Sequence, residues 1–270
     1  YIGFTDYLKK KKKKTFTSIV RATLKNNNLI NHKIIYKADD KYYSNSLIHY
    51  GTRIVFDKEG YLYFSIGDRG NRNQAQLLNT PNGKIHRLND DGSIPKDNPF
   101  VNNNNAIKSI WTYGNRNPQG LAIHPTSLII FETEHGPKGG DELNILSSGS
   151  NYGWPEITYG KNYSGTTITK HTHKKGMEQP VIHWTPSIAV CGIDFYDGNI
   201  FKNWKNNLMV TSLKFENLYR LEITNNEIID QELIYHAGSR IRDVETGPDG
   251  YIYVALEEPG RIIRFMPIKN

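Results

Sequence analysis

The sequence predicts an all-β protein, most simply a β-propeller, on three observations. Strand-like segments recur along the whole chain, and each is bounded by turns rich in Gly, Pro or Asp. No segment of ten or more residues combines a 3.6-residue apolar period with helix caps. At about 40 to 50 residues for each four-stranded blade, a chain of 270 residues has room for about five or six blades. A pair of β-sandwich sheets is the structural alternative.

Four segments carry the repeat most clearly. Residues 60–68 alternate apolar and aromatic side chains after the turn "DKEG". Residues 124–136 enter a strand after a turn with Pro, and residues 206–223 contain a strand, a turn and a second strand. Residues 247–265 predict two strands around "EEPG" after the turn "PDG". Each unit ends in a polar loop, and a propeller presents such loops around one end of its channel.

Composition narrows the functional classes. The chain is 37% hydrophobic and 23% charged, which is typical of a globular protein, and it has no apolar run of membrane-spanning length. The net charge is +7, and Lys9 to Lys14 contribute much of it. We interpret this run as a solvated loop or tail, because like charges repel. The rest of the chain has no recognisable nucleic-acid module, so we expect no nucleic-acid partner.

The ends and the single cysteine give less information. Cys191 is the only cysteine, which excludes an internal disulfide and a cysteine-based zinc site. The chain begins with Tyr1, so we expect a processed chain or a fragment in which a signal peptide is not visible.

Four cations stand beside predicted strands, in "GNRNPQG", "SLK" and "RIRD". They are Arg116, Lys214, Arg240 and Arg242. If they converge, they require an anionic partner, and arginine forks suit carboxylates or phosphates. Surface salt bridges are the alternative for each of them. The run "EHGPKGGDELN", residues 134–144, suits neither a helix nor a strand, and by itself it predicts an ordered Gly-rich turn with ion pairs.

Eight stretches, in order from about residue 15 to 265, resemble the soluble PQQ-dependent aldose sugar dehydrogenases of the glucose/sorbosone dehydrogenase family. They are "HYGTRIVFDKEGYLYFSIGDRG", "NGKIHRLNDDGSIPKDNPF", "YGNRNPQGLAIHP", "TEHGPKGGDELN", "GSNYGWPEITYG", "WTPSIA", "SLK" and "RIRDVETGPDG". The resemblance implies a six-bladed propeller. It also implies that residues 1–270 form one domain that lacks part of the N-terminal blade, including a pocket Gln of the family.

The resemblance implies an oxidoreductase that converts the anomeric hydroxyl of an aldose to a lactone by hydride transfer to PQQ. His49, in "IHYG", matches the general base, a task for which imidazole has a suitable pKa. PQQ carries three carboxylates, which agrees with the cationic loops. The positions that match cofactor contacts are Arg116, Asn117, Gln119, Ser212, Leu213, Lys214, Arg240, Ile241 and Arg242.

The same resemblance implies calcium. The carbonyls of Gly136 and Pro137 match a Ca²⁺ that also touches PQQ and polarises the quinone, and Glu142 and Tyr152 match a second, structural Ca²⁺ site. Around the sugar, the expected residues are Tyr163, Trp184, Ser187, Asp68 and Gln74 or Gln76.

Departures from the family pattern leave alternatives open. Asn115 stands where His is common, "HYG" replaces His-Phe-Gly, and "SIAVCG" replaces Ser-Ile-Ala-Pro-Ser-Gly. A truncated, non-catalytic propeller that acts as a binding module is one alternative, and a calcium-dependent sugar lactonase is the other. For the dehydrogenase, we expect an external electron acceptor, a periplasmic or secreted location, no transmembrane segment, and a monomer or homodimer.

Overall fold

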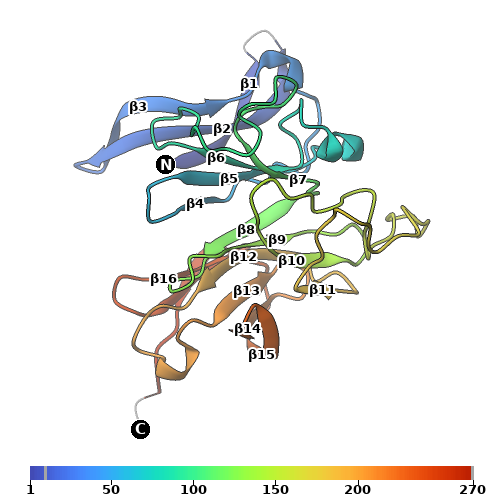
Figure 1. The fold of residues 1–270 in the computed structure, drawn as a ribbon. Helices are drawn as coiled ribbons and strands as arrows, with labels where there is room; N and C mark the ends of the chain where they lie inside the picture. Colours follow the sequence, from blue (N-terminus) through green and yellow to red (C-terminus); the bar gives the residue numbers. More distant parts are fainter. Residues whose placement is uncertain (9–10, 269–270) are drawn as a thin grey trace. The chain divides into compact units, whose positions relative to one another are not determined.

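The computed structural model describes residues 1–8 and 11–268, and in them the protein is all-β. Five antiparallel sheets account for the strands, and the only helices in this part of the chain are three 3-10 turns. No helix among these residues has the length and apolar character needed to cross a membrane. The chain groups into two compact units, which are described separately (Figure 1).

Unit 1 comprises residues 1–118, 147–157 and 173–178. Its first sheet has the order β1-β2-β3 and its second the order β4-β5-β6-β7. The strands are β1 (Ile2–Leu8), β2 (Lys11–Lys25), β3 (Asn28–Lys37), β4 (Ile54–Phe56), β5 (Leu62–Ile66), β6 (Lys84–Leu88) and β7 (Ile110–Tyr113). The 3-10 turns are η1 (Asp40–Tyr42) and η2 (Arg72–Gln76).

The core of unit 1 lies between these two sheets. Every residue of β5 and β6 is buried, and Phe64 stacks on His86 with ring centroids 5.0 Å apart. Phe16 and Ile19 of β2 join this apolar cluster. The expected strand in residues 60–68 is therefore present as β5, where alternate side chains meet two buried surfaces.

Part of the lysine run forms a strand, which corrects the expectation of a solvated loop or tail. Residues 11–14 begin β2 instead of forming a loop or tail, while Lys9 and Lys10 lie outside the described residues. The β2–β3 hairpin turns at Asn26 and Asn27, which both have positive φ, as the turn between two twisted strands requires. Of residues 11–14, Lys11 pairs with Leu8 of β1, and the pairing of β2 with β3 begins at Ser18. The lysine run therefore extends a strand that its later residues hold in the sheet.

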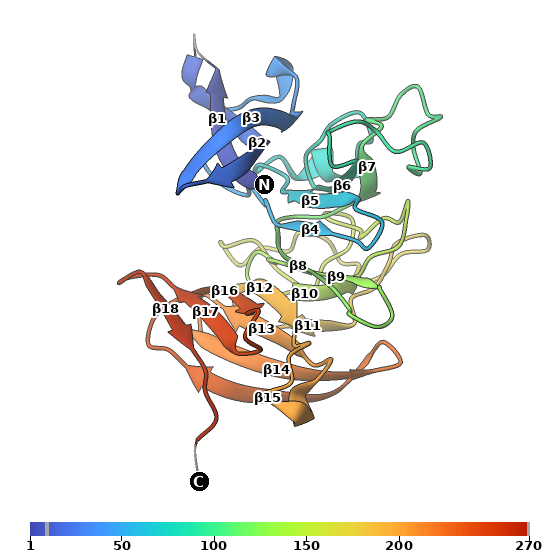
Figure 2. The same ribbon diagram turned by 90° about the vertical axis from the view of Figure 1, so that its left-hand side faces the viewer.

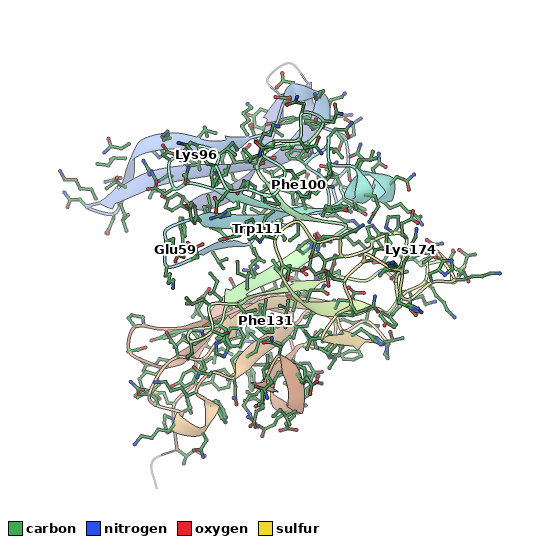
Figure 3. The ribbon with its side chains drawn as sticks, viewed as in Figure 1. Glu59, Lys96, Phe100, Trp111, Phe131 and Lys174 are labelled. Atoms are coloured by element: carbon green, nitrogen blue, oxygen red, sulfur yellow. The ribbon has the colours of Figure 1, made fainter. Side chains whose placement is uncertain are left out.

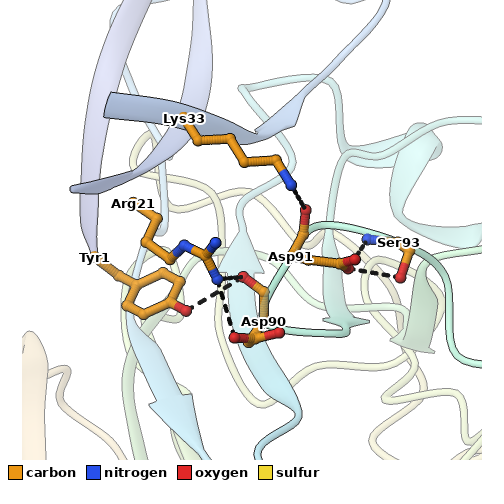
Figure 4. Close-up of polar contacts among 6 residues, drawn as sticks. All are labelled: Tyr1, Arg21, Lys33, Asp90, Asp91 and Ser93. Atoms are coloured by element: carbon orange, nitrogen blue, oxygen red, sulfur yellow. Dashed lines mark hydrogen bonds and ion pairs between the residues drawn. The ribbon is translucent and has the colours of Figure 1, made fainter. Parts of the chain in front are cut away.

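Polar contacts fasten the β2–β3 hairpin to the turn after β6 (Figure 4). Arg21 Nη1 lies 3.0 Å from Asp90 Oδ2, and Lys33 Nζ donates to the carbonyl of Asp91 at 2.8 Å. Asp91 is itself held by Ser93, whose amide donates to its carboxylate. The basic strands therefore find local counter-charges.

Unit 2 comprises residues 119–146, 158–172 and 179–270. Its sheets have the orders β11-β10-β9-β8, β12-β13-β14-β15 and β16-β17-β18 (Figure 2). The strands are β8 (Pro118–Ile123), β9 (Ile130–Glu134), β10 (Asp141–Ile145), β11 (Ile182–Trp184), β12 (Val190–Phe195), β13 (Leu208–Ser212), β14 (Asn217–Thr224), β15 (Glu227–His236), β16 (Ile241–Thr246), β17 (Ile252–Leu256) and β18 (Arg261–Arg264). One 3-10 turn, η3 (Lys202–Trp204), follows β12.

Two apolar clusters join the three sheets of unit 2. Phe131 of β9, labelled in Figure 3, packs against Phe195 of β12 with ring centroids 5.1 Å apart. Met209 of β13 packs in the cluster that contains Val244 of β16 and Val254 of β17. The strands expected in residues 124–136, 206–223 and 247–265 are all present.

Candidate functional site

In unit 1, the expected base lies against a buried carboxylate. His49 Nδ1 lies 2.6 Å from Asp68 Oδ1, and the two side chains are 15% and 2% exposed. A carboxylate only accepts hydrogen bonds, so Nδ1 carries the proton and the lone pair is on Nε2. His49 also has a φ of 54°, a left-handed conformation that is uncommon for residues other than Gly. The pair thus presents one imidazole nitrogen as a proton acceptor.

Three hydrogen bonds hold the carboxylate of Asp68. Besides the contact with His49, Oδ1 accepts from the amide of Gly70 at 2.8 Å and Oδ2 accepts from Trp154 Nε1 at 2.9 Å. Burial alone raises the pKa of Asp68, but the bonds from His49, Gly70 and Trp154 outweigh it and lower that pKa. Asp68 was expected beside the sugar, whereas these bonds favour a role in orienting His49.

Trp154 connects Asp68 to further residues of unit 1. Its ring lies beneath the buried guanidinium of Arg116, with 5.4 Å between Cζ and the ring centroid. Its carbonyl accepts a 2.8 Å hydrogen bond from Gln76, whose amide also pairs with that of Asn151 at 2.8 and 3.0 Å. Gln76 therefore braces this region, and its expected place beside the sugar stays a prediction. Asn117 is buried too, and its Oδ1 lies close to Gly67.

A buried lysine secures the neighbouring η2 turn. Lys84 is fully buried, and its Nζ donates to the carbonyls of Gln74, Ala75 and Asn82 at 2.9, 2.8 and 2.6 Å. Burial lowers the pKa of Lys84 well below its ordinary value. These three bonds fix the turn that carries Gln74 and Gln76. The Gln74 side chain also braces this turn, because it accepts a hydrogen bond from Asn82.

In unit 2, two expected cofactor residues at the start of β16 share one carboxylate partner. Arg240 and Arg242 both form ion pairs with Glu257, and Arg242 Nη1 also contacts Cys191 Sγ at 3.7 Å. Ile241 points to the opposite face and is fully buried. Gln119 of β8 reaches the same cysteine, with 4.0 Å between its Oε1 and Sγ. Arg240, Arg242 and Gln119 are thus linked through Glu257 and Cys191.

The loop after β13 carries the other cofactor candidates. The amides of Leu213 and Lys214 donate to the carbonyls of Ala189 and Ile188, and Ser212 Oγ donates to Ile188 at 2.7 Å. These bonds fix the backbone, while the Lys214 side chain is exposed with its Nζ 5.5 Å from the Phe215 ring centroid.

The turn expected to bind calcium is organised by Asp141. The Asp141 carboxylate is fully buried and accepts from the amides of Gly136 and Val190 at 2.9 and 3.1 Å, and from Ser187 Oγ. A side chain at Gly136 has no room, because its Cβ would lie 2.2 Å from the carbonyl oxygen of Gly139. Asp141 therefore holds the turn that contains Gly136 and Pro137. Ser187, expected near the sugar, supports this turn.

Glu142 is half-buried and belongs to an acidic group on β9 and β10 whose other members, Glu132 and Glu134, are buried. It pairs in register with Glu134, and Asn144 pairs with Glu132, so the four side chains share one sheet face. Asn144 Nδ2 donates to Glu132 at 3.1 Å and to Glu142 at 3.4 Å. Burial, and then the charge of Glu134, raises the pKa of both Glu132 and Glu142 well above the ordinary value.

Such a group requires protons or a cation. Glu132 Oε1 is buried without a hydrogen-bond partner in the described residues, which makes it a candidate cation ligand. Within residues 1–8 and 11–268, however, no three His, Cys, Asp or Glu side chains form a ready-made metal cage.

Three further aromatic residues were expected at the site, and the structure places them in different surroundings. Tyr152 is buried in unit 1, and its hydroxyl accepts from the amide of Ser147 at 2.9 Å. In unit 2, Tyr163 is 73% exposed on a loop, whereas Trp184 is buried in the core and donates to Gln231.

Several functional candidates were missed from the sequence. Glu132 and Glu134 flank Thr133 in "FETE", and their alternation on a buried strand was the available signal. Lys84 and Trp154 stand inside motifs quoted for the family, but neither received a role. Glu257 had no sequence signal beyond its charge.

The family model Glucose / Sorbosone dehydrogenase matches residues 1–264. Aldose sugar dehydrogenase YliI of Escherichia coli is 44% identical over 223 residues, which are 81% of this chain and 60% of the relative. The chain spans only 55% to 60% of the length of the first curated relatives that it matches.

Solved structures give the same family and fold. The apo-form of the soluble aldose sugar dehydrogenase of E. coli has a TM-score of 0.91 and 37% identity, covering 97% of this chain and 76% of that one. The PQQ-bound aldose sugar dehydrogenase of Streptomyces coelicolor has a TM-score of 0.73 and 25% identity, covering 92% and 71%. The prediction of a β-propeller is confirmed, with the five described sheets as blades, and the number of six blades stays a prediction.

Proposed function

Because the chain belongs to the glucose/sorbosone dehydrogenase family, we propose that it is a PQQ-dependent aldose dehydrogenase that oxidises the anomeric hydroxyl of a sugar to a lactone. The observation that carries this proposal is the His49–Asp68 pair, which leaves Nε2 as a proton acceptor. Similarity to an aldose sugar dehydrogenase and to the PQQ-bound form of another supports the same reaction.

In the proposed reaction, His49 Nε2 takes the proton of the anomeric hydroxyl as the hydride leaves the anomeric carbon. PQQ, when bound, supplies the quinone that accepts the hydride. Asp68 keeps the imidazole in one tautomer and stabilises the imidazolium that forms. Trp154 and Gly70 keep Asp68 ionised, because both donate to its carboxylate. Each protein group thus prepares His49 to accept one proton.

The residues fit a polycarboxylate cofactor. Arg240 and Arg242 converge on Glu257 and are 51% and 38% exposed, so their guanidinium groups remain accessible to a carboxylate. Lys214 is exposed on a fixed loop. We propose these three cations, with Arg116, Asn117 and Gln119, as cofactor ligands.

We also propose calcium binding in two places, where the supporting features are a rigid turn and a group of acidic side chains. Gly136 and Pro137 belong to a turn that Asp141 holds rigidly, and backbone carbonyls are good calcium ligands. The acidic group of Glu132, Glu134 and Glu142 supplies carboxylate oxygens, one of which has no hydrogen-bond partner in the described residues. When bound beside the quinone, Ca²⁺ would act as a Lewis acid. Tyr152 as a ligand stays a prediction.

The decisive experiment is reconstitution of the purified protein with PQQ and CaCl₂, followed by dye reduction with a panel of aldoses. We expect turnover that requires both additions and is lost with EGTA. His49→Ala should retain PQQ binding and lose at least about a hundredfold in turnover. His32→Ala, at an exposed histidine of β3, is the matched control. PQQ binding without turnover on any aldose would favour the non-catalytic binding module instead.

The substrate panel also separates the lactonase alternative, because a lactonase consumes sugar lactones without reducing a dye. The particular sugar, the external electron acceptor, the periplasmic or secreted location and the monomer or homodimer all stay predictions.

A further inference from the structure

The arginine pair of β16 already has an internal carboxylate partner. Arg240 immediately precedes β16 and Arg242 lies in it, and both side chains converge on Glu257 while Ile241 between them is buried. Two neighbouring guanidinium groups repel each other, so their placement requires a counter-charge. Glu257 supplies it from the end of β17.

Glu257 divides its two oxygens between the two arginines. Oε2 lies 3.1 Å from Arg240 Nε, and Oε1 accepts from Arg242 Nε at 2.8 Å and also from Arg242 Nη2. The backbone fixes this placement, because the amide of Glu257 donates to the carbonyl of Arg240 at 2.9 Å. The three side chains are 33% to 51% exposed, so a dissolved ligand can reach them.

Arg242 is held on its other side by the buried Cys191, whose sulfur accepts from Nη1 at 3.7 Å. Partial burial lowers the pKa of Arg242, but Cys191 and Glu257 raise it more, and the net shift is upward. The guanidinium therefore stays charged and oriented with contacts on both sides. If Glu257 loses its charge, the strand and Cys191 still position Arg242.

We propose that Glu257 is a built-in competitor at the cofactor clamp: it neutralises one of the two positive charges of Arg240 and Arg242, and thereby weakens the binding of polycarboxylate ligands. This inference rests on the proposed role of the two arginines in binding PQQ. With Glu257 ionised, the three side chains carry a net charge of +1, and with a neutral residue they carry +2. An incoming carboxylate must share the guanidinium donors with Glu257 or displace it.

Glu257→Gln tests the proposal, because the amide oxygen can still accept from Arg242 while the charge is lost. Glu258→Gln is the matched control: the neighbouring side chain is exposed, and the substitution changes the net charge of the protein equally. Both variants and the unaltered protein are titrated with PQQ in the presence of CaCl₂, at 50 mM and 1 M NaCl. Equilibrium dialysis gives Kd, and thermal unfolding checks that each variant is folded.

We expect Glu257→Gln to bind PQQ about fivefold more tightly than Glu258→Gln at 50 mM NaCl, as a unit charge several ångströms away at the protein surface would produce. At 1 M NaCl this difference should largely vanish, because salt screens it. A residue with only a structural role would weaken binding when replaced. Equal or weaker binding by Glu257→Gln, or an advantage that survives 1 M NaCl, overturns the proposal.

A second probe separates this inference from the proposed function. Benzene-1,3,5-tricarboxylate offers carboxylates without a quinone. If no form of the protein binds PQQ, but Glu257→Gln binds this tricarboxylate more tightly than Glu258→Gln, the competitor role stands and the PQQ assignment fails. If neither probe binds to any form, both proposals fail.

Discussion

His49 and Asp68 form a 2.6 Å contact between imidazole Nδ1 and carboxylate Oδ1, and the carboxylate side chain is 2% exposed. The ring is therefore fixed in one tautomer, with Nε2 available for a proton. Since Asp68 has bonds to Gly70 and Trp154 as well, it orients His49 rigidly.

Asp68→Asn should leave cofactor binding intact and lower turnover by about a hundredfold or more. The amide can donate to Nδ1, which would move the imidazole proton to Nε2 and remove the proton acceptor. Steady-state dye reduction measures turnover, and PQQ titration measures binding. Asp39→Asn, at a side chain that is 76% exposed, is the control. Turnover retained within twofold would contradict an orienting role for Asp68.

Trp154→Phe should remove one hydrogen bond from the Asp68 carboxylate and leave the His49 side chain unchanged. The indole N–H donates to Asp68 Oδ2, so its loss leaves a buried carboxylate oxygen without that donor and lowers the free energy of unfolding by about 1–3 kcal/mol. The pKa of Asp68 should rise, because a bond that lowers it is removed. The acidic limb of the pH–turnover profile should therefore move to higher pH.

Trp111→Phe is the matched control, because the indole N–H of Trp111 is buried without a hydrogen-bond partner among the described residues. Its stability should change less than that of Trp154→Phe, and its pH–turnover profile should not move. If both variants shift the profile equally, the donor on Asp68 is not the cause. Chemical denaturation gives the free energies of unfolding.

The strands could be predicted because their signal is local. Residues 60–68 alternate side chains with a period of two, and that pattern survives in β5, where the whole strand is buried. The prediction of a loop or tail for the lysine run was wrong because charge composition describes solvation, whereas residues 11–14 extend a strand whose later residues pair with both β1 and β3. Like charges along the run therefore do not prevent residues 11–14 from belonging to a strand.

The site was partly predictable. Residue types and the family resemblance pointed to His49, Arg240 and Arg242 as candidates, but not to their partners. Asp68 lies 19 residues from His49, and Glu257 lies 15 from Arg242, so each contact depends on strand register and loop course that the sequence does not display. Glu132 was missed because an acidic side chain on a strand is normally assigned to solvent, whereas here it is fully buried.

Asp194 should make the free energy of unfolding depend on pH. Burial raises its pKa from 3.8 to about 6, although Thr246 donates two hydrogen bonds to it and lowers it in part. Since the folded-state pKa is the higher one, folding favours the protonated form. This contribution to folding stability is present below about pH 4 and is lost as pH rises through about 6. A pKa shift of this size corresponds to about 3 kcal/mol.

Asp194→Asn should therefore gain stability relative to the unaltered protein as the pH rises from 4 to 7.5. The amide oxygen can still accept both bonds from Thr246. Urea unfolding at several pH values measures the difference in free energy. Asp230→Asn, an exposed position on β15, should show no comparable trend. A difference between Asp194→Asn and the unaltered protein that is independent of pH would show that Asp194 does not titrate in this range.

Asp141→Asn should disorganise the turn proposed to bind calcium. Both carboxylate oxygens accept from N–H or O–H donors, namely the amides of Gly136 and Val190 and the hydroxyl of Ser187. An amide nitrogen in place of one oxygen would face a donor, so the free energy of unfolding should fall by about 1–3 kcal/mol. Because the carbonyls of Gly136 and Pro137 lie on this turn, calcium affinity should fall as well.

Ser187→Ala separates the two effects, because it removes one donor and leaves the contacts with Gly136 and Val190 in place. It should lose stability but retain most of the calcium affinity, as measured by calorimetric titration with CaCl₂. Equal calcium affinity in Asp141→Asn and the unaltered protein would contradict the role of Asp141, since a turn that binds calcium equally well without its central acceptor does not depend on it.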